Sequence, residues 1–414
     1  MNEQAAQDSQ TYDVVVVGGG PAGATVAHEL AGEGRMVLLV DREERIKPCG
    51  GAIPPALIRD FAIDESLLVA RIRSAQMIAP SERRVDMPIE DGFVGMVDRE
   101  DFDAWLRERA VAAGAERRRA VFRTFERDPD GTPRLTFAVK EAGRREPETF
   151  SIRARCVVGA DGARSAVGRQ AVKGADKVRC VFAYHEIVDS PRETAAFDPE
   201  RCDVYYQGRI SPDFYGWIFP HGPRTSIGTG TARKGYGLRD AVTRLRATVG
   251  MEGCTTIRRE GAPIPMKPLK RWDNGRDVVL AGDAAGVVAP ASGEGIYYAM
   301  VSARRVGEAV LAFLESGDAK ALATARRRFM REHGRVFRVL SILQAVWYRS
   351  DRQRERFVSI CRDRDVQRLT WEAYMNKKLV RHQPFAHLRV FFKDVAHLLG
   401  LADGRGRTRQ RSSG

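Results

Sequence analysis

The sequence predicts an α/β protein in which a parallel-sheet domain contains an inserted antiparallel sheet and is followed by a helical region. Apolar runs end in glycine-rich or acidic turns near residues 14–23, 156–162 and 278–283, a pattern typical of strands in a parallel sheet. Residues 180–275 alternate apolar and polar positions and are rich in aromatic residues and turn signals, as expected of antiparallel strands. From about residue 318 the pattern is helical and strongly basic.

A glycine motif follows the first apolar run. Val14–Val17 are expected to form a strand buried on both faces, and Gly18, Gly20 and Gly23 then give the spacing G-x-G-x-x-G. Such glycines serve a tight turn, a close backbone approach to a pyrophosphate, and close helix–strand packing. The helix predicted over Pro21–Leu30 begins where a phosphate would lie, so its free N–H groups and its dipole would hold the anion.

An acidic residue completes this unit. The next apolar run, Met36–Val40, ends in Asp41, eighteen residues after Gly23. A carboxylate at this distance is expected to contact the ribose of an adenosine. Strand, glycines, helix, strand and acid together predict a Rossmann-type adenine-dinucleotide site. The alternative is a glycine turn in an α/β unit that binds no ligand.

Two later strand–turn units place further groups at the same kind of sheet edge, where ligands bind in such folds. The first runs into Asp161 and Gly162, and the second into Asp283. Asp283 is placed to hydrogen-bond the hydroxyl groups of a cofactor's linker. The loop PASGEG then leads into a helix from about Ile296. The N-terminus of that helix favours an anionic group, although a helix cap with a tight turn is the alternative.

The loop between the dinucleotide unit and the first antiparallel strands carries a cysteine. Proline and paired glycines predict irregular structure over residues 47–51. The glycines would allow a flat group to approach closely, and Cys49 would point at it. The alternative is that Cys49 is a small buried hydrophobe. A helix is expected to follow Asp98, its N-cap, and Arg99 in its first turn faces water or reaches a cofactor phosphate.

Aromatic residues are concentrated in the segment DFYGWIFP. It contains Phe214, Tyr215, Trp217 and Phe219 within eight residues. Because side chains alternate along a strand, the last three are expected on one face. Aromatic residues usually form a sheet core. Beside a bound cofactor, such a face would instead form a wall for a hydrophobic substrate.

Charge and cysteine usage limit the partners. The formal net charge of +14 implies an anionic partner such as a phosphorylated cofactor or an anionic membrane surface. We expect no nucleic acid, because the arginines are scattered and no nucleic-acid motif stands out. The six cysteines are widely spaced with no C-x-x-C pair, so neither a metal site nor a disulfide framework is expected.

The location is predicted to be cytoplasmic, with peripheral membrane attachment as an option. The N-terminus is polar, and no stretch approaches the roughly eighteen apolar residues of a spanning helix. Near the C-terminus, Phe385, Leu388, Phe392, Val395 and Leu399 recur at helical spacing with basic residues between them. This segment would either pack on the body of the protein or lie in a membrane interface.

These patterns divide the chain into four parts. The dinucleotide-binding domain is expected to be discontinuous, and the antiparallel domain is inserted into it. A helical region and a disordered tail follow. The predicted boundaries are 10–70, 98–180 and 276–317 for the first domain, 71–97 and 181–275 for the second, 318–402 for the helices and 403–414 for the tail.

Several segments together resemble a known family. They are KPCGGAIPP, DFYGWIFP, ASGEGIYYAM and LQAVWYRSDRQRERFVSICRDRDVQRLTWEAY. The three glycine–acid turns resemble those of FAD-dependent flavoproteins of the glutathione-reductase-2 or p-hydroxybenzoate-hydroxylase type. The four segments resemble, more narrowly, the geranylgeranyl reductases of chlorophyll and bacteriochlorophyll synthesis. This similarity runs nearly from end to end of the chain.

The resemblance implies bound FAD, NADPH as a transient hydride donor, and a geranylgeranyl tail esterified to bacteriochlorophyllide as the substrate. It also implies that the aromatic segment forms the substrate wall, with Tyr215, Trp217 and Phe219 as the substrate-binding residues. The family's FAD-contacting positions match Gly18, Gly20, Gly23, Asp41, Arg99, Asp161 and Asp283. We extend the predicted cofactor site to Pro21, Ala22, Arg42, Cys49, Gly50, Gly162, Gly293, Gly295 and Ile296.

The expected chemistry is the reduction of an isolated alkene. It needs a hydride donor, a proton donor and a dry pocket, and we expect Cys49 or Tyr215 near the path of the proton. A flavin hydroxylase of the same fold, a non-catalytic carrier of prenyl lipids and an archaeal-type lipid saturase are alternatives. The sequence leaves open whether the substrate is the pigment ester or free geranylgeranyl diphosphate, and it does not indicate an oligomeric state.

Overall fold

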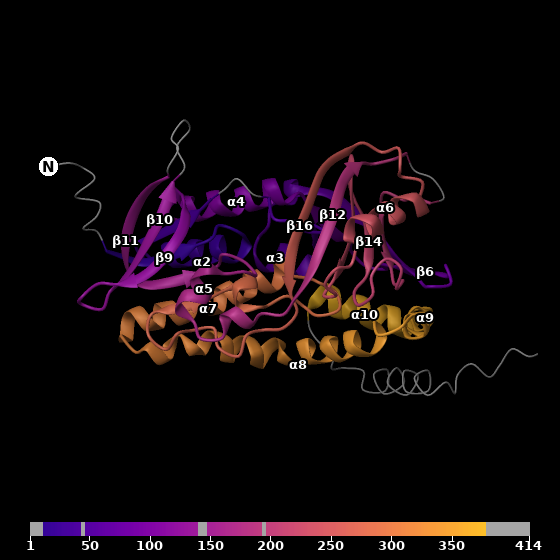
Figure 1. The fold of residues 1–414 in the computed structure, drawn as a ribbon. Helices are drawn as coiled ribbons and strands as arrows, with labels where there is room; N and C mark the ends of the chain where they lie inside the picture. The colour runs from indigo at the N-terminus through magenta and orange to yellow at the C-terminus, as the bar shows by residue number, and fades with distance from the viewer. Residues whose placement is uncertain (1–10, 43–45, 140–146, 193–195, 378–414) are drawn as a thin grey trace, which may run out of the picture.

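The computed structural model describes residues 11–42, 46–139, 147–192 and 196–377. Two sheets lie side by side along a long molecule, and helices run beneath both of them (Figure 1). The strands are β1 (Thr11–Val17), β2 (Val37–Asp41), β3 (Ala52–Ile53), β4 (Leu68–Ile72), β5 (Ser74–Ile78), β6 (Arg84–Pro88), β7 (Val94–Val97), β8 (Glu116–Arg119), β9 (Val121–Arg127), β10 (Pro133–Val139), β11 (Glu148–Gly159), β12 (Cys180–Asp189), β13 (Arg201–Tyr205), β14 (Gly216–His221), β15 (Arg224–Thr231), β16 (Thr256–Pro265) and β17 (Val278–Leu280).

Four of the nine α-helices in the described part of the chain follow one another after residue 295, and the other five lie between strands. The α-helices are α2 (Pro21–Gly32), α3 (Pro55–Asp60), α4 (Arg99–Ala112), α5 (Ala166–Ala171), α6 (Leu238–Thr248), α7 (Ile296–Ser316), α8 (Ala323–Trp347), α9 (Asp351–Ile360) and α10 (Arg364–Asn376). Short 3-10 turns are η1 (Glu65–Leu67), η2 (Ala175–Lys177), η3 (Gly282–Ala285) and η4 (Ala319–Ala321).

The first sheet has the order β8-β2-β1-β11-β10-β9, and β17 pairs with the C-terminal half of β11. The strands β2, β1, β11 and β17 are parallel to one another. Val14, Val15 and Val16 in β1 are fully buried, as the run of apolar residues predicts for a strand covered on both faces. The parallel strands therefore bring their carboxyl ends to one edge, and the predicted α/β fold is confirmed.

The second sheet has the order β16-β12-β15-β14-β13-β5-β6. Its neighbours are antiparallel except for β13 and β5, which run parallel. The sheet was expected to be antiparallel, but it is mixed because one of its strand pairs is parallel. The reason is that β5 comes from the earlier chain segment and adds to the edge of β13, a long-range pairing that alternation within the sequence does not reveal.

The segment 71–97 is shared between two sheets. Its strands β5 and β6 join the second sheet, whereas β7 pairs with β3 and β4 in a separate three-stranded sheet. Gly95 in β7 allows this packing, because a Cβ atom there would lie 2.8 Å from the Leu68 side chain. The small sheet therefore links the dinucleotide unit to the second sheet.

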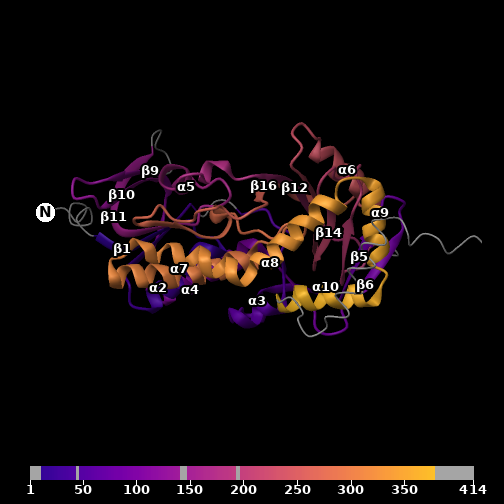
Figure 2. The same cartoon turned by 90° about the horizontal axis from the view of Figure 1, so that it is seen from below.

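The C-terminal helices connect the two halves of the molecule. Figure 2 shows α8 running from beside α7 toward the second sheet, where α9 and α10 lie. α8 contacts α7 and α9, α9 contacts β6, and α10 contacts α3. The predicted helical region is confirmed as far as Asn376, and its segment from Phe385 to Leu399 lies outside the described residues. Within the described ranges, none of the helices has both the length and the apolar character needed to cross a bilayer.

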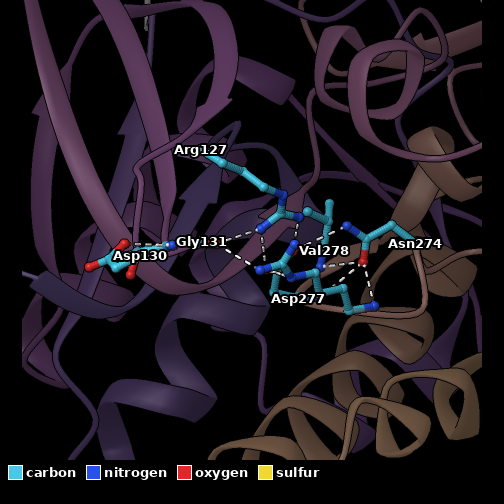
Figure 3. A network of polar contacts seen from close by, with 8 residues as sticks. Arg127, Asp130, Gly131, Asn274, Asp277 and Val278 are labelled. Carbon is cyan, nitrogen blue, oxygen red and sulfur yellow. Dashed lines mark hydrogen bonds and ion pairs between the residues drawn. The ribbon is translucent and has the colours of Figure 1, made fainter.

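A polar network fastens the β9–β10 hairpin to the loop before β17 (Figure 3). The guanidinium of Arg127 donates to both carboxylate oxygens of Asp277 at 2.6 and 2.7 Å and to the carbonyl of Gly131 at 3.0 Å. Asn274 organises the same loop by accepting from the backbone N–H groups of Asp277 and Val278. This network therefore ties the turn at residues 128–131 to the loop before β17.

A buried histidine joins α8 to α7. The ring of His333 lies 5.0 Å from that of Phe329 and 5.5 Å from that of Tyr298, between ring centroids. Burial lowers the pKa of His333 from 6.5 to about 4, because the apolar surroundings disfavour the charged ring. The His333 ring is therefore neutral in the folded protein above about pH 4.

We expect the protein to lose stability as the pH falls from about 6.5 to about 4. In this window the unfolded chain binds the His333 proton and the folded protein does not, which amounts to about 3 kcal/mol. The same fall in pH should destabilise the His333→Leu variant by about 3 kcal/mol less than the wild type. Urea unfolding at pH 7 and pH 4 measures both losses. Equal losses in the two proteins would contradict this assignment.

Candidate functional site

The glycine loop after β1 is built on contacts that only glycine permits. Gly18 has φ +105°, and a Cβ atom there would lie 2.5 Å from the carbonyl oxygen of Ala160. A Cβ atom on Gly23 would lie 1.8 Å from the carbonyl oxygen of Gly18. These distances are far below a normal contact, so the first and third glycines of the motif allow β1, β11 and α2 to meet.

Gly20 differs from its two partners because nothing lies within 4 Å of the position of its Cβ atom. It is the N-cap of α2, has extended backbone angles, and makes no side-chain cap. The first backbone N–H groups of a helix have no partner within the helix. An open glycine at such a helix start is a cradle that a Cβ atom would partly fill and that a phosphate fits.

Asp41 ends β2 beside this loop. A Cβ atom on Gly19 would lie 2.3 Å from an Asp41 carboxylate oxygen, and that carboxylate lies 3.4 Å from Nη1 of Arg107. The same guanidinium donates to the carbonyl of Gly19 at 3.4 Å. Asp41 is therefore held at the glycine loop, whereas Arg42 is exposed.

The turn after β11 packs against the glycine loop through its backbone. The Cα atom of Asp161 would lie 3.0 Å from a Cβ atom on Gly18. The Asp161 carboxylate itself accepts from the hydroxyl of Ser165 and from the backbone N–H groups of Ala166 and Val167, at 2.5 to 3.1 Å. The side chain thus caps α5, while Gly162, with φ +88°, has open space at its Cβ position.

The turn after β17 closes on the start of α2. Gly282 has φ +62°, and a Cβ atom there would lie 2.7 Å from the Cβ atom of Ala22. The buried carboxylate of Asp283 accepts from Nζ of Lys47 at 2.6 Å. Three turns far apart in the sequence therefore meet at one edge of the first sheet.

The cysteine loop lies between the helix α4 and the second sheet. Arg99 is buried rather than exposed to water, and its guanidinium forms two hydrogen bonds of 2.9 and 2.7 Å with Asp103. Burial opposes the charge, but Asp103 and Cys49 outweigh it and raise the pKa of Arg99. A Cβ atom on Gly50 would lie 3.0 Å from the ring of Phe219.

Asp98 is the N-cap of α4, but its side chain makes no cap and instead lies 3.3 Å from Nδ1 of His221.

The aromatic residues of β14 and its approach share one face, as alternation predicts. The ring centroids of Tyr215 and Trp217 are 6.0 Å apart, and those of Trp217 and Phe219 are 6.3 Å apart. The hydroxyl of Tyr215 donates to the carbonyl of Ser292 at 2.6 Å. Burial raises the pKa of Tyr215, so this hydroxyl keeps its proton.

One cavity lies where these parts meet, between the cysteine loop, the aromatic face and the start of α7. Its walls include both predicted catalytic residues, all three predicted substrate residues and seven further predicted cofactor residues. The predicted residues that line it are Pro21, Cys49, Gly50, Arg99, Tyr215, Trp217, Phe219, Asp283, Gly293, Gly295 and Ile296. The other predicted residues lie away from the cavity, along the sheet edge or at the start of α2, and are Gly18, Gly20, Ala22, Gly23, Asp41, Arg42, Asp161 and Gly162.

The loop before α7 is held from two sides. The hydroxyl of Tyr348 in the C-terminal region donates to the carbonyl of Ala291 at 3.0 Å. Lys377 donates to Glu294, and both side chains are almost wholly buried. Burial raises the pKa of Glu294 and lowers that of Lys377. With Tyr215 holding the same loop from the second sheet, the C-terminal helices fix one wall of the cavity.

Several residues of this site were not predicted. Arg107 lies two helical turns after Arg99 on the buried face of α4, and a charged residue repeated at that spacing is the signal that could have found it. Lys47, Glu294 and Lys377 carry no comparable signal, because each meets its partner only in the folded chain. His185 of β12 also lines the cavity.

The fold and this sheet edge define a class of protein, the flavoproteins with an FAD binding domain. Residues 11–336 match the family described as FAD binding domain. The chain is 57% identical over 390 residues to geranylgeranyl diphosphate reductase of Rhodobacter capsulatus, covering 94% of this chain and 98% of that protein. It is 38% identical to the chloroplastic geranylgeranyl diphosphate reductase of Oryza sativa, covering 93% and 86%. The chain therefore belongs to the geranylgeranyl diphosphate reductase family.

A solved structure shares the fold. The geranylgeranyl bacteriochlorophyll reductase-like protein of Thermoplasma acidophilum superposes with a TM-score of 0.77 over 91% of this chain and 99% of that chain, at 22% identity. The observed edge also fits FAD. It offers an open glycine at a helix N-terminus for a pyrophosphate and a carboxylate at the end of β2 for a ribose.

We expect Gly20→Ala to weaken FAD binding at least tenfold without unfolding the protein. The added methyl group meets no protein atom, so it only occupies the space in which a phosphate would approach. FAD affinity is measured by titrating the apoprotein, and Gly32→Ala at the other end of α2, where the space is equally open, is the control. Unchanged affinity in Gly20→Ala would exclude this cradle.

We expect Lys377→Met to lower the free energy of unfolding by about 3–5 kcal/mol, because it leaves the Glu294 charge buried without its partner. The double variant Glu294→Leu with Lys377→Met should recover most of the loss. Urea unfolding measures both, with the exposed Lys320→Met as the control. A single variant as stable as the wild type would show that the pair does not hold the loop.

Proposed function

We propose that this protein is an FAD-dependent reductase that uses NADPH to saturate carbon–carbon double bonds of a geranylgeranyl chain. The observation that carries this proposal is the cavity in which the aromatic face, the cysteine loop and the start of α7 meet. Membership of the geranylgeranyl diphosphate reductase family supports the prenyl substrate. We propose the tail esterified to bacteriochlorophyllide as the physiological form, with the free diphosphate as a second acceptor.

The cofactor would lie along the edge of the first sheet and end in the cavity. We propose that the N-terminus of α2 at Gly20 holds the pyrophosphate, that Asp41 binds the adenosine ribose, and that Asp283 binds the linker. Gly293, Gly295 and Ile296 at the start of α7 would then meet the flavin ring, where the helix dipole favours negative charge. Bound FAD in its reduced form supplies a hydride.

The protein's own part is to orient an alkene and to keep water away. An isolated alkene has no carbonyl group to polarise, so a dry pocket and a proton donor near the reacting carbon are what the chain must supply. The cavity is lined by Phe214, Tyr215, Trp217 and Phe219 together with aliphatic residues of β16 and α7. These surfaces suit a hydrocarbon chain.

The reaction consumes one NADPH and one proton for each double bond and gives NADP⁺ and a single bond. We propose Cys49 or Tyr215 near the path of that proton. The Tyr215 hydroxyl is protonated and already acts as a donor, to Ser292. Cys49 lies beside the buried guanidinium of Arg99 and lines the same cavity.

The test is an anaerobic incubation of the holoprotein with NADPH and geranylgeranyl-bacteriochlorophyll, followed by mass spectrometry of the tail. Stepwise gains of two hydrogens ending at the phytyl ester are expected. A parallel incubation with geranylgeranyl diphosphate separates the two head groups. Flavin bleaching without any change in tail mass would reject the proposal in favour of another prenyl substrate or of oxygen chemistry.

We expect Cys49→Ser or Tyr215→Phe to lower kcat by about 10²-fold or more while FAD loading stays normal, because loss of a general acid typically costs this much. Cys254→Ser and Tyr236→Phe, which lie outside the cavity, are the matched controls. Turnover is followed by NADPH oxidation and by product mass. Full activity in both site variants would remove both residues from the proton path.

A further inference from the structure

A line of polar side chains runs across the same face of the second sheet as the aromatic residues, because Ser226 lies opposite Phe219 and His185 lies opposite Glu260. Trp217 donates its indole N–H to the hydroxyl of Ser226 at 3.1 Å. Nδ1 of His185 lies 2.9 Å from the same hydroxyl, and its Nε2 lies 2.9 Å from a carboxylate oxygen of Glu260. Four neighbouring strands, β14, β15, β12 and β16, each supply one member.

Chemistry determines the direction of the two outer hydrogen bonds, and the neutral form of the histidine determines that of the middle one. An indole N–H can only donate, so the Ser226 hydroxyl accepts from Trp217 and has its own proton left to give. The Glu260 carboxylate can only accept, so Nε2 of His185 carries a proton, and in the neutral ring Nδ1 is then bare and accepts the Ser226 proton. Arg258 forms an ion pair of 2.8 Å with the other oxygen of Glu260. Each polar atom from the indole to the carboxylate has a partner.

The sheet is shaped to hold the two rings. Trp217 and His185 both lie opposite Gly228, one on each neighbouring strand. A Cβ atom on Gly228 would lie 2.2 Å from the indole and 2.6 Å from Cβ of His185. The bare glycine therefore leaves the space in which the rings approach to 6.3 Å between centroids.

The chain of bonds lies in the interior, where an unpaired polar group is costly. Ser226 is completely buried, and His185 and Trp217 are 3% and 6% exposed. His185 and Trp217 nevertheless both line the cavity. The bond to Ser226 thus directs the indole N–H toward β15, and the ring can present carbon atoms to the cavity.

We propose that His185 is a positioning residue that, through Ser226, fixes the indole plane of Trp217 for binding of the prenyl chain. Glu260 sets the histidine tautomer that this requires, as a carboxylate does in other oriented histidines. A released indole would rotate and place its N–H against hydrocarbon, which weakens binding of an apolar ligand. This inference rests on the proposed prenyl substrate, and it concerns binding rather than the chemical step.

The test removes the middle of the line and measures binding without turnover. Holoprotein is labelled with 5-fluorotryptophan, and the ¹⁹F signal of Trp217 is assigned from its absence in Trp217→Phe. Geranylgeranyl diphosphate is then titrated in the absence of NADPH. Ser226→Ala and His185→Gln are expected to shift this signal and to raise Kd five- to twentyfold. Thr225→Ala is the control, because its hydroxyl is equally buried on β15 but bonds to Ser190 instead.

A double variant makes the test specific. Trp217→Phe has no indole N–H, so adding Ser226→Ala to it should raise Kd no further. The inference would be overturned by the same Kd in wild type and Ser226→Ala, or by an equal effect of Ser226→Ala in the wild type and in the Trp217→Phe variant. Absence of binding to the wild type would also overturn it. Tight binding without any reduction on adding NADPH would count against the reductase proposal alone and would leave this inference standing.

Discussion

The close approach of backbone at Gly18 and Gly23 is the constraint on which the rest of the site depends. It lets α2 start directly at the end of β1, with the turn after β11 packed on top. Because parallel strands end at one edge of a sheet, the turns after β1, β2, β11 and β17 then meet at that edge. A single methyl group at Gly23 would push this edge apart.

The second sheet and the C-terminal helices add the remaining walls of the cavity to that edge. Tyr215 reaches from the sheet to Ser292, and Tyr348 and Lys377 reach from the helices to Ala291 and Glu294. The loop before α7 is therefore held by segments from three parts of the chain.

Polar groups around the cavity are paired among themselves or turned away from it. Arg99 is bound by Asp103, Asp283 by Lys47, and Trp217 by Ser226. In a low-dielectric interior each such pairing removes a group that would otherwise attract water. The pairing of these groups with one another is what leaves an aromatic surface suited to a hydrocarbon chain.

The sequence by itself determined the α/β class, the glycine turn, the acid at Asp41 and the shared face of Tyr215, Trp217 and Phe219, because these depend on local spacing and periodicity. Only the tertiary structure decided that Arg99 is buried and that the Asp161 side chain caps α5. The same holds for the parallel pairing of β5 with β13 and for the contact between Glu294 and Lys377. Each of these features depends on a partner distant in the chain or on a competing local hydrogen bond. Spacing and composition do not indicate which partners the folded backbone brings within contact distance.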